Sequence, residues 1–446
     1  MTTRWVDDSN IALLTDLYEL TMLQSYFAEG MNDVAVFDLF IRRLPATRNY
    51  FIACGLEHVL DYLERFAFSE EGIEYLRSLD RFSNPFLDSL RDFRFTGDVY
   101  AVPEGTAIFP NEPVIVVVAP LREAQLIETF VMNQIQLATL AASKAARVVS
   151  AARGRSVVDF GVRRMHGADA GLKDPRAFYI AGVNGTSNVL AGQVYGIPLS
   201  GTMAHSYIQT FEDELEAFRR FVWSYPTAIL LIDTYDVRKG TEHVIQLARE
   251  LRSDFRISGV RLDSGDLATG ALEIRRMLDE AGLRQVKIFV SSSLDEYAIE
   301  RLVAGGAPID GFGVGAHMAT SSDSPVLDTA YKLAEYAGQP KLKLSESKAT
   351  LPGRKQIFRK RFSGKATGDT IGLRDEHVPG DPLLQQVMAA GKRLRPPESL
   401  QSCRDRCRAE LTGLPENLLS LAAADVPYNI DISPGLMRLR DEIAQM

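Results

Sequence analysis

Short apolar runs alternate with amphipathic stretches through the middle of the chain. From residue 156 onward these runs end in polar or glycine residues: SVVDFG, AFYIAGVNG, IPLSGTMAH, AILLIDTYD, SGVRLDSGD, KIFVSSS and GFGVGAH. Helix-spaced segments lie between several of them, at 209–222, 240–254, 266–282 and 294–305. Strands that alternate with amphipathic helices predict parallel βαβ units. Because no Gly-rich dinucleotide loop follows a first strand, the pattern favours a closed, irregular α/β barrel over an open doubly wound sheet.

The pattern before this region is different. Residues 11–30 and 55–80 have helix-spaced apolar positions, whereas 35–42 and 98–119 have strand-like ones broken by Pro and Gly turns. Residues 121–153 contain neither Gly nor Pro and predict one long helix or two abutting helices.

After about residue 325 the strand-like pattern returns. It is found in YKLAEYAG, KLKLS and KQIFRKRF, which precede an Arg-rich helical tail. We therefore expect an α/β cap domain formed from both chain termini, residues 1–120 and 325–446, beside a barrel formed by 121–324.

Composition narrows the class of protein. The chain has 446 residues, 46% of them hydrophobic, and a net charge of −8, which excludes disorder as the main state. A net acidic chain argues against general nucleic-acid binding, so an anionic ligand must meet local cations. No apolar run is long enough to span a membrane, and MTTRWVDDSN lacks the layout of a signal peptide, so we expect a cytoplasmic protein. Cys54, Cys403 and Cys407 are too few for a disulfide framework.

Polar residues gather where the predicted strands end, which is where α/β barrels build their active sites. These residues are Arg163, Ser187, Thr202, His205, Asp233, Arg261, Asp263, Ser292, Ser293, Gly313 and Gly315. His205 is the best candidate for a reactive group, because a carboxylate such as Asp233 at the next strand end can fix its tautomer and leave the other nitrogen as base or nucleophile. His58 and His243 lie on helical stretches, whereas His166 and His317 lie near strand ends and have no assigned role.

Two loops and several cations suggest phosphate chemistry. Backbone amides of 291–293, before a predicted helix at 294, and of 311–315 are candidates for anion nests. Countercharge for a polyanionic substrate is available from Lys144, Arg147, Arg163, Arg164, Lys348, Arg354 and Lys355.

Nine segments together resemble nicotinate phosphoribosyltransferase. They are TDLYELTM (15–22), RNY (48–50), ATLAASKAAR (138–147), DFGVRR (159–164), NGTSNVLAG (184–192), GIPLSGTMAHS (196–206), LIDTYD (231–236), VRLDSGD (260–266) and KATLPGRKQ (348–356). The similarity runs from about residue 11 to ISPGL near 432. It implies the type II phosphoribosyltransferase fold, an irregular α/β barrel beside a cap. It also implies synthesis of nicotinate mononucleotide and diphosphate from nicotinate and phosphoribosyl diphosphate, within NAD biosynthesis.

The same resemblance implies further partners and a covalent intermediate. ATP would be a co-substrate, Mg²⁺ would be required, and His205 would carry the phosphoryl group. The enzyme would be a homodimer with shared sites, in which a neighbour supplies cations. The candidate cations are Arg42, Arg48, Lys144, Arg147 and Lys348.

Residue roles carry over by motif. Tyr18, Thr202 and Arg261 would contact nicotinate, and Phe160 would stack on its ring with Arg163 beside it. Asp263 would face the ribose hydroxyls or the developing oxocarbenium charge. Ser292, Ser293, Gly313, Gly315 and Thr320 would lie around the 5-phosphate. Ala316 departs from the family pattern, in which a hydroxyl residue or glycine follows GVG.

Three alternatives stay open on the sequence alone. Nicotinamide phosphoribosyltransferase resembles the chain but has an aspartate at the position of Ser187, which would repel a carboxylate, so Ser187 favours an acid substrate. Quinolinate phosphoribosyltransferase is a weaker rival because its chains are shorter. A catalytically silent regulatory barrel is disfavoured by the intact His205, Asp233 and Arg261.

Overall fold

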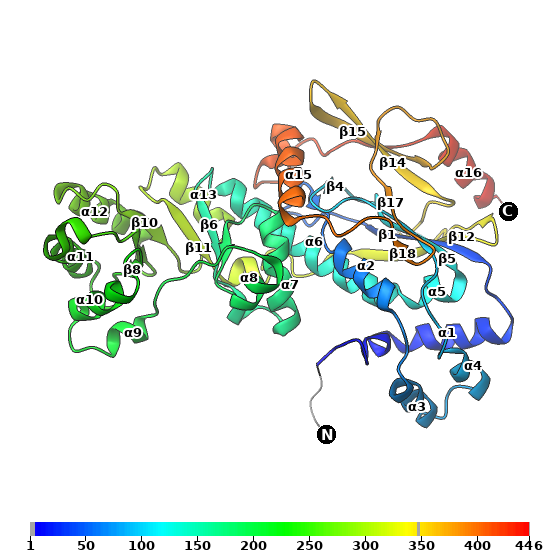
Figure 1. The fold of residues 1–446 in the computed structure, drawn as a ribbon. Helices are drawn as coiled ribbons and strands as arrows, with labels where there is room; N and C mark the ends of the chain where they lie inside the picture. The colour runs from blue at the N-terminus through cyan, green and yellow to red at the C-terminus, as the bar shows by residue number, and fades with distance from the viewer. Residues whose placement is uncertain (1–4, 346–347, 446) are drawn as a thin grey trace. The chain divides into compact units, whose positions relative to one another are not determined.

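The computed structural model describes residues 5–345 and 348–445. Residues 1–4, the first part of MTTRWVDDSN, lie outside the described residues. The chain divides into two compact units (Figure 1). Unit 1 comprises Met1–Leu140 and Val326–Met446, and unit 2 comprises Ala141–Pro325. The predicted domain boundaries and the cap role stay predictions.

Unit 1 is built on a seven-stranded sheet with the order β13-β12-β1-β5-β3-β17-β18. Its strands are β1 (Val34–Ile41), β3 (Asp98–Ala101), β5 (Pro113–Pro120), β12 (Thr329–Tyr336), β13 (Gln339–Pro340), β17 (Gln385–Ala389) and β18 (Lys392–Arg393). The central strand β1 is buried over Ala35–Ile41 and pairs antiparallel with β5 and β12. Residues from both ends of the chain thus share one sheet.

Smaller sheets and helices complete unit 1. A four-stranded sheet has the order β16-β14-β15-β19, with β14 (Lys355–Phe362), β15 (Lys365–Leu373), β16 (Asp381–Pro382) and β19 (Ile430–Ile432), and β2 (Phe51–Ile52) pairs with β4 (Ala107–Ile108). The helices are η1 (Ile11–Leu13), α1 (Leu17–Ala28), α2 (Leu56–Arg65), α3 (Glu70–Ser78), α4 (Asn84–Ser89), α5 (Leu121–Leu126), α15 (Leu400–Gly413), η4 (Glu416–Leu419) and α16 (Pro434–Ala444). Helix α6 (Glu128–Ala151) continues from unit 1 into unit 2. Of the two possibilities predicted after Pro120, one long helix or two abutting helices, the structure has the second.

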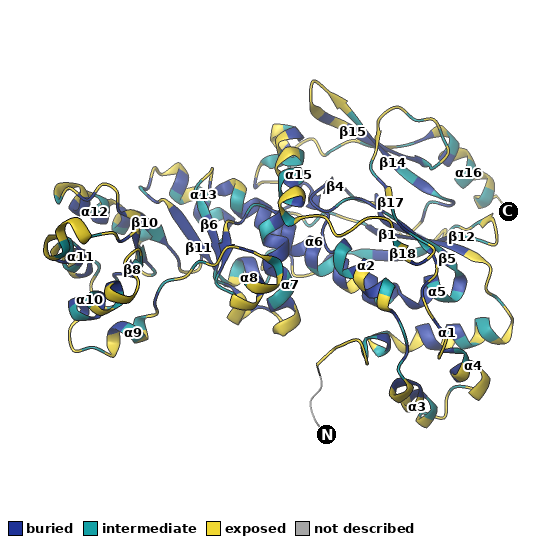
Figure 2. Cartoon of the chain, viewed as in Figure 1, coloured by how far each residue is buried: buried dark blue, intermediate teal, exposed yellow. Residues whose placement is uncertain are grey.

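Unit 2 contains a six-stranded, parallel sheet with the order β7-β6-β11-β10-β9-β8. Its strands are β6 (Ser156–Asp159), β7 (Gly185–Thr186), β8 (Ile229–Leu231), β9 (Gly259–Leu262), β10 (Lys287–Val290) and β11 (Gly311–Val314). Figure 2 shows these strands largely buried. Because β7 and β8 are the two edges, the sheet is a curled half-barrel, and the prediction of a closed barrel is wrong.

The helices of unit 2 follow the strands. They are η2 (Val162–Arg164), α7 (Gly167–Ile180), α8 (Val189–Tyr195), α9 (His205–Gln209), α10 (Glu214–Ser224), α11 (Val237–Leu251), η3 (Arg252–Asp254), α12 (Leu267–Glu280), α13 (Glu296–Ala304) and α14 (Ala316–Ala319). Asp236, Asp266 and Asp295 each accept a hydrogen bond from an amide in the first turn of the helix that follows. The acidic residues of TYD and SGD thus have a capping role, which satisfies amides that a helix leaves unpaired.

Three strand predictions are wrong. AFYI is the end of helix α7, and IPLSG forms only an isolated bridge between Leu199 and Thr186. KLKLS is not a strand over its described residues, 341–345. The periodicity of a short apolar run does not show whether it is a buried strand or a buried helix, which is why AFYI was predicted as a strand.

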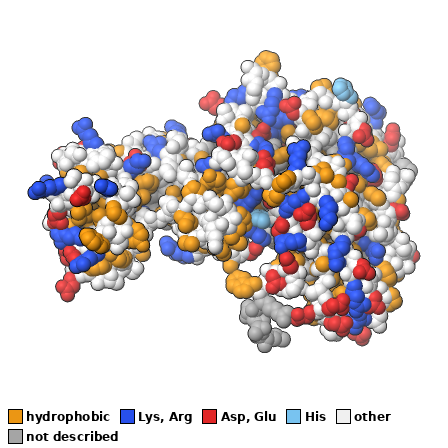
Figure 3. Space-filling model, viewed as in Figure 1, with side chains coloured by type: hydrophobic (Ala, Val, Ile, Leu, Met, Phe, Trp, Pro, Cys, Tyr) orange, Lys and Arg blue, Asp and Glu red, His pale blue; other side chains and the backbone are white. Residues whose placement is uncertain are grey.

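Cys54, Cys403 and Cys407 are buried and form no disulfide. None of the helices in the described chain is long and apolar enough to cross a membrane. Lys, Arg, Asp and Glu side chains are interspersed over the face seen in Figure 3.

Close backbone packing in unit 2 predicts a large effect at Gly240. A Cβ there would lie 2.1 Å from the carbonyl oxygen of Ile232, the residue that follows β8. We expect Gly240→Ala to lower the free energy of unfolding by about 1–3 kcal/mol through overpacking. Gly171 is the control, because it also lies within a helix but its Cβ would have only Val162 nearby, at 3.7 Å. Gly171→Ala should be neutral or stabilising by up to about 1 kcal/mol in urea unfolding, and equal losses in both variants would contradict this account.

Candidate active site

A cavity of about 540 Å³ opens at the carboxyl ends of the unit 2 strands. The residues that line it come from the loops after β6, β7 and β9 and from the segment before α9: Phe160, Val162, Arg163, Ser187, Val189, Leu199, Ser200, Gly201, Thr202, Met203, Ala204, His205, Arg261 and Asp263. Parallel strands place their carboxyl ends at one edge, which explains why residues far apart in the sequence meet here. Seven of the residues predicted from the sequence line the cavity: Phe160, Arg163, Ser187, Thr202, His205, Arg261 and Asp263. Asp233 lies behind this lining and accepts a hydrogen bond from the Asp263 amide.

Phe160 forms an apolar wall of the cavity. Its amide donates to the carbonyl of Val314 at 2.8 Å, which anchors it beside β11. A Cβ on Gly313 would lie 2.5 Å from the Phe160 ring. Glycine at 313 therefore makes room for the ring, and the prediction that 311–315 is an anion nest is wrong for Gly311–Val314, which is strand β11.

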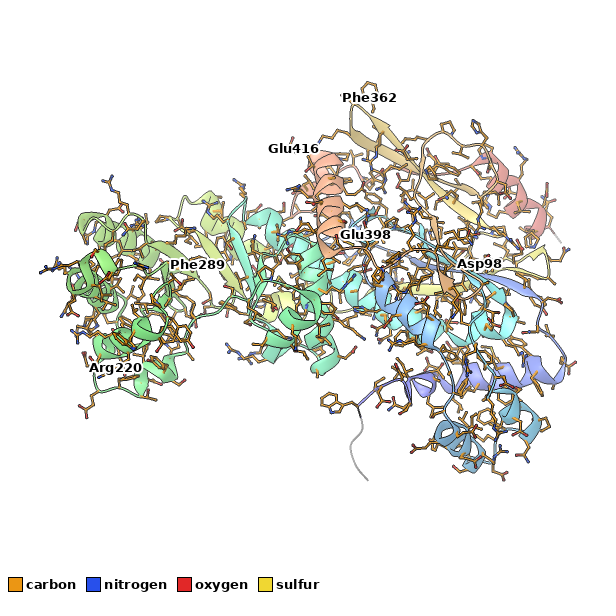
Figure 4. The ribbon with its side chains drawn as sticks, viewed as in Figure 1. Asp98, Arg220, Phe289, Phe362, Glu398 and Glu416 are labelled. Carbon is orange, nitrogen blue, oxygen red and sulfur yellow. The ribbon has the colours of Figure 1, made fainter. Side chains whose placement is uncertain are left out.

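The neighbouring strand β10 has a related arrangement. The ring of Phe289 on β10 (Figure 4) lies close to Gly311, and a Cβ on Gly311 would be only 2.6 Å from a carbon of that ring. Both strand glycines of β11 thus accommodate aromatic rings.

Two guanidinium groups line the cavity. Arg261 donates to the Ser291 hydroxyl at 3.0 Å and to the Met203 carbonyl at 2.9 Å, while its Nε is buried without a partner. Burial lowers the pKa of Arg261, and the carboxylates of Asp263 and Asp233 oppose that shift. Arg163 is exposed and has no carboxylate partner among the described residues. The cavity thus offers positive charge and unused donors to an anion.

His205 begins helix α9, and its ring lies between two polar groups. Nδ1 is 3.1 Å from the Thr234 hydroxyl, and Nε2 is 3.6 Å from the Asp263 carboxylate. The predicted hydrogen bond from His205 to Asp233 is wrong, because among the described residues Asp233 receives the Asp263 amide at 2.8 Å and the Ser264 hydroxyl at 2.6 Å. Asp233 therefore holds the loop that carries Asp263, and its Oδ1 is buried without a partner.

Asp159 is a site residue that the sequence analysis missed. It is fully buried, and its carboxylate accepts from the Gly161 amide at 2.8 Å and the Thr186 hydroxyl at 2.7 Å. Its backbone carbonyl accepts from the Ser187 amide at 2.9 Å. Burial raises the pKa of Asp159 to about 6, against the lowering effect of these hydrogen bonds. Asp159 thus ties the loop of Phe160 to that of Ser187, and the signal for it was an acid at the end of an apolar strand.

A second buried acid lies near Asp159. Asp174 on α7 has a carboxylate oxygen without a partner, and burial, followed by the charges of Asp159 and Asp169, raises its pKa to about 8. An apolar environment disfavours a carboxylate, so Asp174 is held protonated at neutral pH.

The predicted phosphate loop lies at a different cavity of unit 2. Ser292 and Ser293, with φ of 91° and 46°, line a hollow of about 330 Å³ together with Gly265 and Arg301. Helix α13 begins only at Glu296, and Asp295 caps it, so the prediction of a helix N-terminus directly after 293 is wrong. Gly315 precedes α14, and Thr320 donates to the Ala316 carbonyl at 2.9 Å.

Most predicted cations outside the cavity are already paired. Lys144 lies 2.6 Å from Glu296 and 2.8 Å from Asp323, and Arg147 lies 3.1 Å from Glu296. Lys144, Arg147 and Glu296 are buried in unit 2. Carboxylates thus already balance Lys144 and Arg147 in this structure, and their contact with a phosphate stays a prediction.

Unit 1 contains the remaining predicted residues. Arg42 pairs with Asp328 at 3.1 Å and Arg48 is buried, whereas Lys348 is exposed and Tyr18 half-exposed. The predicted countercharges Arg354 and Lys355 pair with Glu335 and Asp38, and Arg164 is exposed on η2 of unit 2.

The other histidines and the cysteine pair have ordinary environments. His58 and His243 lie on helices as predicted, and His243 faces Glu214 at 2.9 Å. His166 precedes α7, and His317 faces the Ser322 hydroxyl at 3.1 Å. Across the described ranges, no group of three or more His, Cys, Asp or Glu side chains is arranged to hold a metal ion.

Comparisons with known proteins cover nearly the whole chain. The model of the nicotinate phosphoribosyltransferase (NAPRTase) family matches residues 155–348, and models of the N-terminal and C-terminal domains of nicotinate phosphoribosyltransferase match 13–136 and 380–440. A nicotinate phosphoribosyltransferase of Mycobacterium tuberculosis is 51% identical over 98% of this chain and 94% of its own. One of Bacillus subtilis is 41% identical over 83% of this chain and 78% of its own.

A solved structure agrees with these matches. The crystal structure of human nicotinic acid phosphoribosyltransferase aligns with a TM-score of 0.86 and 29% identity, over 96% of this chain and 99% of that one.

The raised pKa of Asp174 predicts a pH-dependent stability. Between about pH 4 and 8 the unfolded chain loses the Asp174 proton while the folded chain keeps it, so this group's contribution to stability falls as pH rises. Asp174→Asn removes that loss. The free energy of unfolding of the variant, relative to the parent, should rise with pH by at most about 1.4 kcal/mol per unit.

Urea unfolding at pH 5, 6, 7 and 8 measures this difference. Asp254→Asn is the control, since Asp254 is an exposed carboxylate on η3 of the same unit and is not among the charges that raise the pKa of Asp174. A difference between Asp174→Asn and the parent that does not change with pH would contradict the assignment.

Proposed function

Because the chain belongs to the nicotinate phosphoribosyltransferase family, we propose that its activity takes place in the cavity at the carboxyl edge of the unit 2 sheet. The protein is a nicotinate phosphoribosyltransferase, an enzyme that joins nicotinate to a phosphoribosyl group in NAD biosynthesis. The observation that carries the location is the meeting in one cavity of an apolar ring, two guanidinium groups and a histidine: Phe160, Arg163, Arg261 and His205.

Nicotinate is a planar ring with one carboxylate, and the cavity offers a matching group for each part. The Phe160 ring provides a flat apolar face, and Arg163 and Arg261 provide cationic donors for the carboxylate. The Ser187 hydroxyl has no partner among the described residues, so it is available as a further donor. Thr202 lines the same cavity, and the contact of Tyr18 with nicotinate stays a prediction from the resemblance.

ATP coupling through His205 is the next part of the proposal. If Nδ1 of His205 donates to the Thr234 hydroxyl, the lone pair lies on Nε2. Nε2 is the ring nitrogen that faces the Asp263 carboxylate. Nε2 attacks the γ-phosphorus of ATP, a P–N bond forms, the bond to the bridging oxygen breaks, and ADP leaves. Asp263 then stabilises positive charge on the imidazole or, in the transfer step, on the ribose.

Mg²⁺ is compatible with two carboxylates near this site. Mg²⁺ is commonly held by one or two carboxylates together with substrate phosphates and water. Asp233 has one buried carboxylate oxygen, Oδ1, without a hydrogen-bond partner. Its other oxygen accepts a hydrogen bond from the backbone amide of Asp263, so the two residues are neighbours. These two residues are the ones that would hold the ion, which neutralises phosphate charge when bound.

The phosphoribosyl group reaches further along the strand ends. Ser292 and Ser293 follow β10, Gly315 follows β11, and Thr320 follows the short helix α14, so these loops are our candidates for the 5-phosphate. Ala316 offers no hydroxyl there, which leaves this contact to backbone amides and Thr320.

We further propose a homodimer with shared active sites, with unit 1 as its cap and the cytoplasm as its location. Exposed apolar side chains surround the cavity, namely Val162, Val189, Leu190, Val194 and Leu199, with Val189 exposed to 71%. Such a patch on a protein surface is typical of an interface. Among the cations predicted to come from a neighbour, Lys348 is exposed, whereas Arg48 is buried.

The main alternative is a phosphoribosyltransferase that acts on nicotinamide. Ser187 argues against it, because the serine hydroxyl can donate a hydrogen bond to the carboxylate of nicotinate. The quinolinate enzyme and the silent barrel are disfavoured by the family match and by the assembled cavity.

The phosphohistidine proposal predicts the effect of His205→Ala. Synthesis of nicotinate mononucleotide that depends on ATP should fall at least about 100-fold, because the acceptor nitrogen is gone, while slow ATP-independent synthesis remains. His243→Gln is the control, since His243 pairs with Glu214 on the outer helices. ATP hydrolysis by His205→Ala at the parent rate would refute the assignment.

Charge at position 187 should decide between acid and amide. Like charges 4 Å apart repel by about 4 kcal/mol at an effective dielectric constant near 20. Ser187→Asp should therefore lower the nicotinate-to-nicotinamide ratio of kcat/KM about 100-fold or more, a ratio that cancels general damage to the fold.

Ser187→Asn is the matched neutral control and should change that ratio far less. The ratio for Ser187→Asp should recover as pH falls and the new carboxyl group protonates. An unchanged ratio in a folded Ser187→Asp enzyme would place the residue outside the nicotinate pocket.

The shared site predicts complementation between two inactive variants. Mixing His205→Ala chains with Lys348→Ala chains should restore partial activity, because one kind of site in the hybrid dimer receives both intact residues. Each variant mixed with itself is the control. Heterodimers that are demonstrated by mass spectrometry but show no recovered activity would exclude a shared site.

A further inference from the structure

A third hollow of unit 2 lies at the amino ends of the strands, the opposite edge from the candidate active site. Its volume is about 370 Å³, and it is bounded by Arg155 before β6, Lys287 at the start of β10, the loop 307–310 before β11, and the end of α12 with its following loop. None of these residues lines the nicotinate cavity.

Positive charge is in excess around this hollow. Arg155, Arg275, Arg284 and Lys287 line it, against Asp279 and Asp310. Arg275 is 2.7 Å from Asp279 and is therefore neutralised. Within the described ranges, no carboxylate lies at ion-pair distance from Arg155, Arg284 or Lys287. This contrasts with the paired arginines elsewhere on α12, such as Arg276 with Glu280.

The scaffold under these charges is rigid. Arg275 donates to the carbonyls of Val286 and Leu283 at 2.8 and 3.1 Å, and Arg155 donates to that of Ile309 at 2.9 Å. Asp310 accepts from the Ile288 amide at 2.8 Å, which uses one of its oxygens in the backbone. The loops that present Arg284 and Lys287 are thus held by partly buried hydrogen bonds.

The lining between the cations is apolar. Val286, Pro308 and Ile309 contribute to it, and Val286 and Ile309 are themselves buried. The hollow is therefore lined mainly by charged side chains, with a smaller apolar part, which suits a small charged ligand more than an apolar one. Cations that lack acidic partners in an acidic chain, whose net charge is −8, create a local field that attracts an anion.

We propose that this hollow is a binding site for a phosphorylated small molecule, separate from the active site. The phosphate lies against Arg284, Lys287 and Arg155, and the less polar part of the ligand packs on Pro308, which is partly exposed. Guanidinium and ammonium donors suit a dianionic phosphate. Because the hollow lies at the amino ends of the strands and the nicotinate cavity at their carboxyl ends, both ligands can be bound at the same time.

The test is calorimetric titration of the full chain with AMP, which combines a phosphate with an apolar planar part. The charge-reversed double variant Arg284→Glu, Lys287→Glu should lose at least tenfold in affinity at one class of site, and its turnover of nicotinate should stay within twofold of the parent. Both side chains are exposed, so the fold should tolerate the change. The neutral pair Arg284→Gln, Lys287→Gln should lose an intermediate amount.

Arg276→Glu is the matched control, because Arg276 is an exposed cation on α12 that does not line the hollow. It should bind AMP as the parent does. Equal AMP isotherms for the parent and the charge-reversed double variant would overturn the proposal. An equal loss in Arg276→Glu would also overturn it, since the effect would then be a general one of net charge.

Discussion

Parallel pairing of β6 with β7 on one side and β11 on the other is the constraint on which the candidate site depends. Val158 and Asp159 lie opposite Gly185 and Thr186, and Gly313 and Val314 lie opposite the same two residues of β6. All three strands therefore end at the same level. The loops with Phe160, Ser187 and Gly315 begin there, and the remaining strands β10, β9 and β8 extend the same edge to Asp263 and Asp233.

Buried polar contacts turn this common edge into a defined pocket. Asp159 links the two loops beside β6, and Asp233 holds the loop that carries Asp263. Both carboxylates contact backbone amides, which fixes loop positions more closely than a side-chain contact alone. The glycines act from the other side, since Gly313 leaves space for the Phe160 ring and Gly240 lets α11 approach β8. An acid substrate then meets a preformed arrangement of a ring and two guanidinium groups.

Much of this arrangement could be predicted from the sequence, and the reasons for the exceptions are physical. Alternation of apolar runs and amphipathic helices predicted the βαβ order, and the position of polar residues after each run predicted six of the fourteen residues that line the cavity. AFYI was misassigned because a short apolar run has no clear period. The partner of His205 was misassigned because sequence order at strand ends does not say which way a carboxylate turns: Asp233 turns to the amide of Asp263, and Thr234 meets the ring instead. The ion pairs of Lys144 and Arg147 could not be predicted, because their partner Glu296 is about 150 residues away along the chain. The resemblance to the family is confirmed by the family models and by the relatives.

The central claim is that an acid-selective phosphoribosyl transfer takes place at the carboxyl edge of the unit 2 sheet. A turnover assay with phosphoribosyl diphosphate and ATP, comparing nicotinate, nicotinamide and quinolinate at matched concentrations, tests it most directly. We expect kcat/KM for nicotinate to exceed that for either other base by at least about 100-fold, since one buried charge mismatch costs several kcal/mol. Equal or faster turnover of nicotinamide or quinolinate would contradict the account.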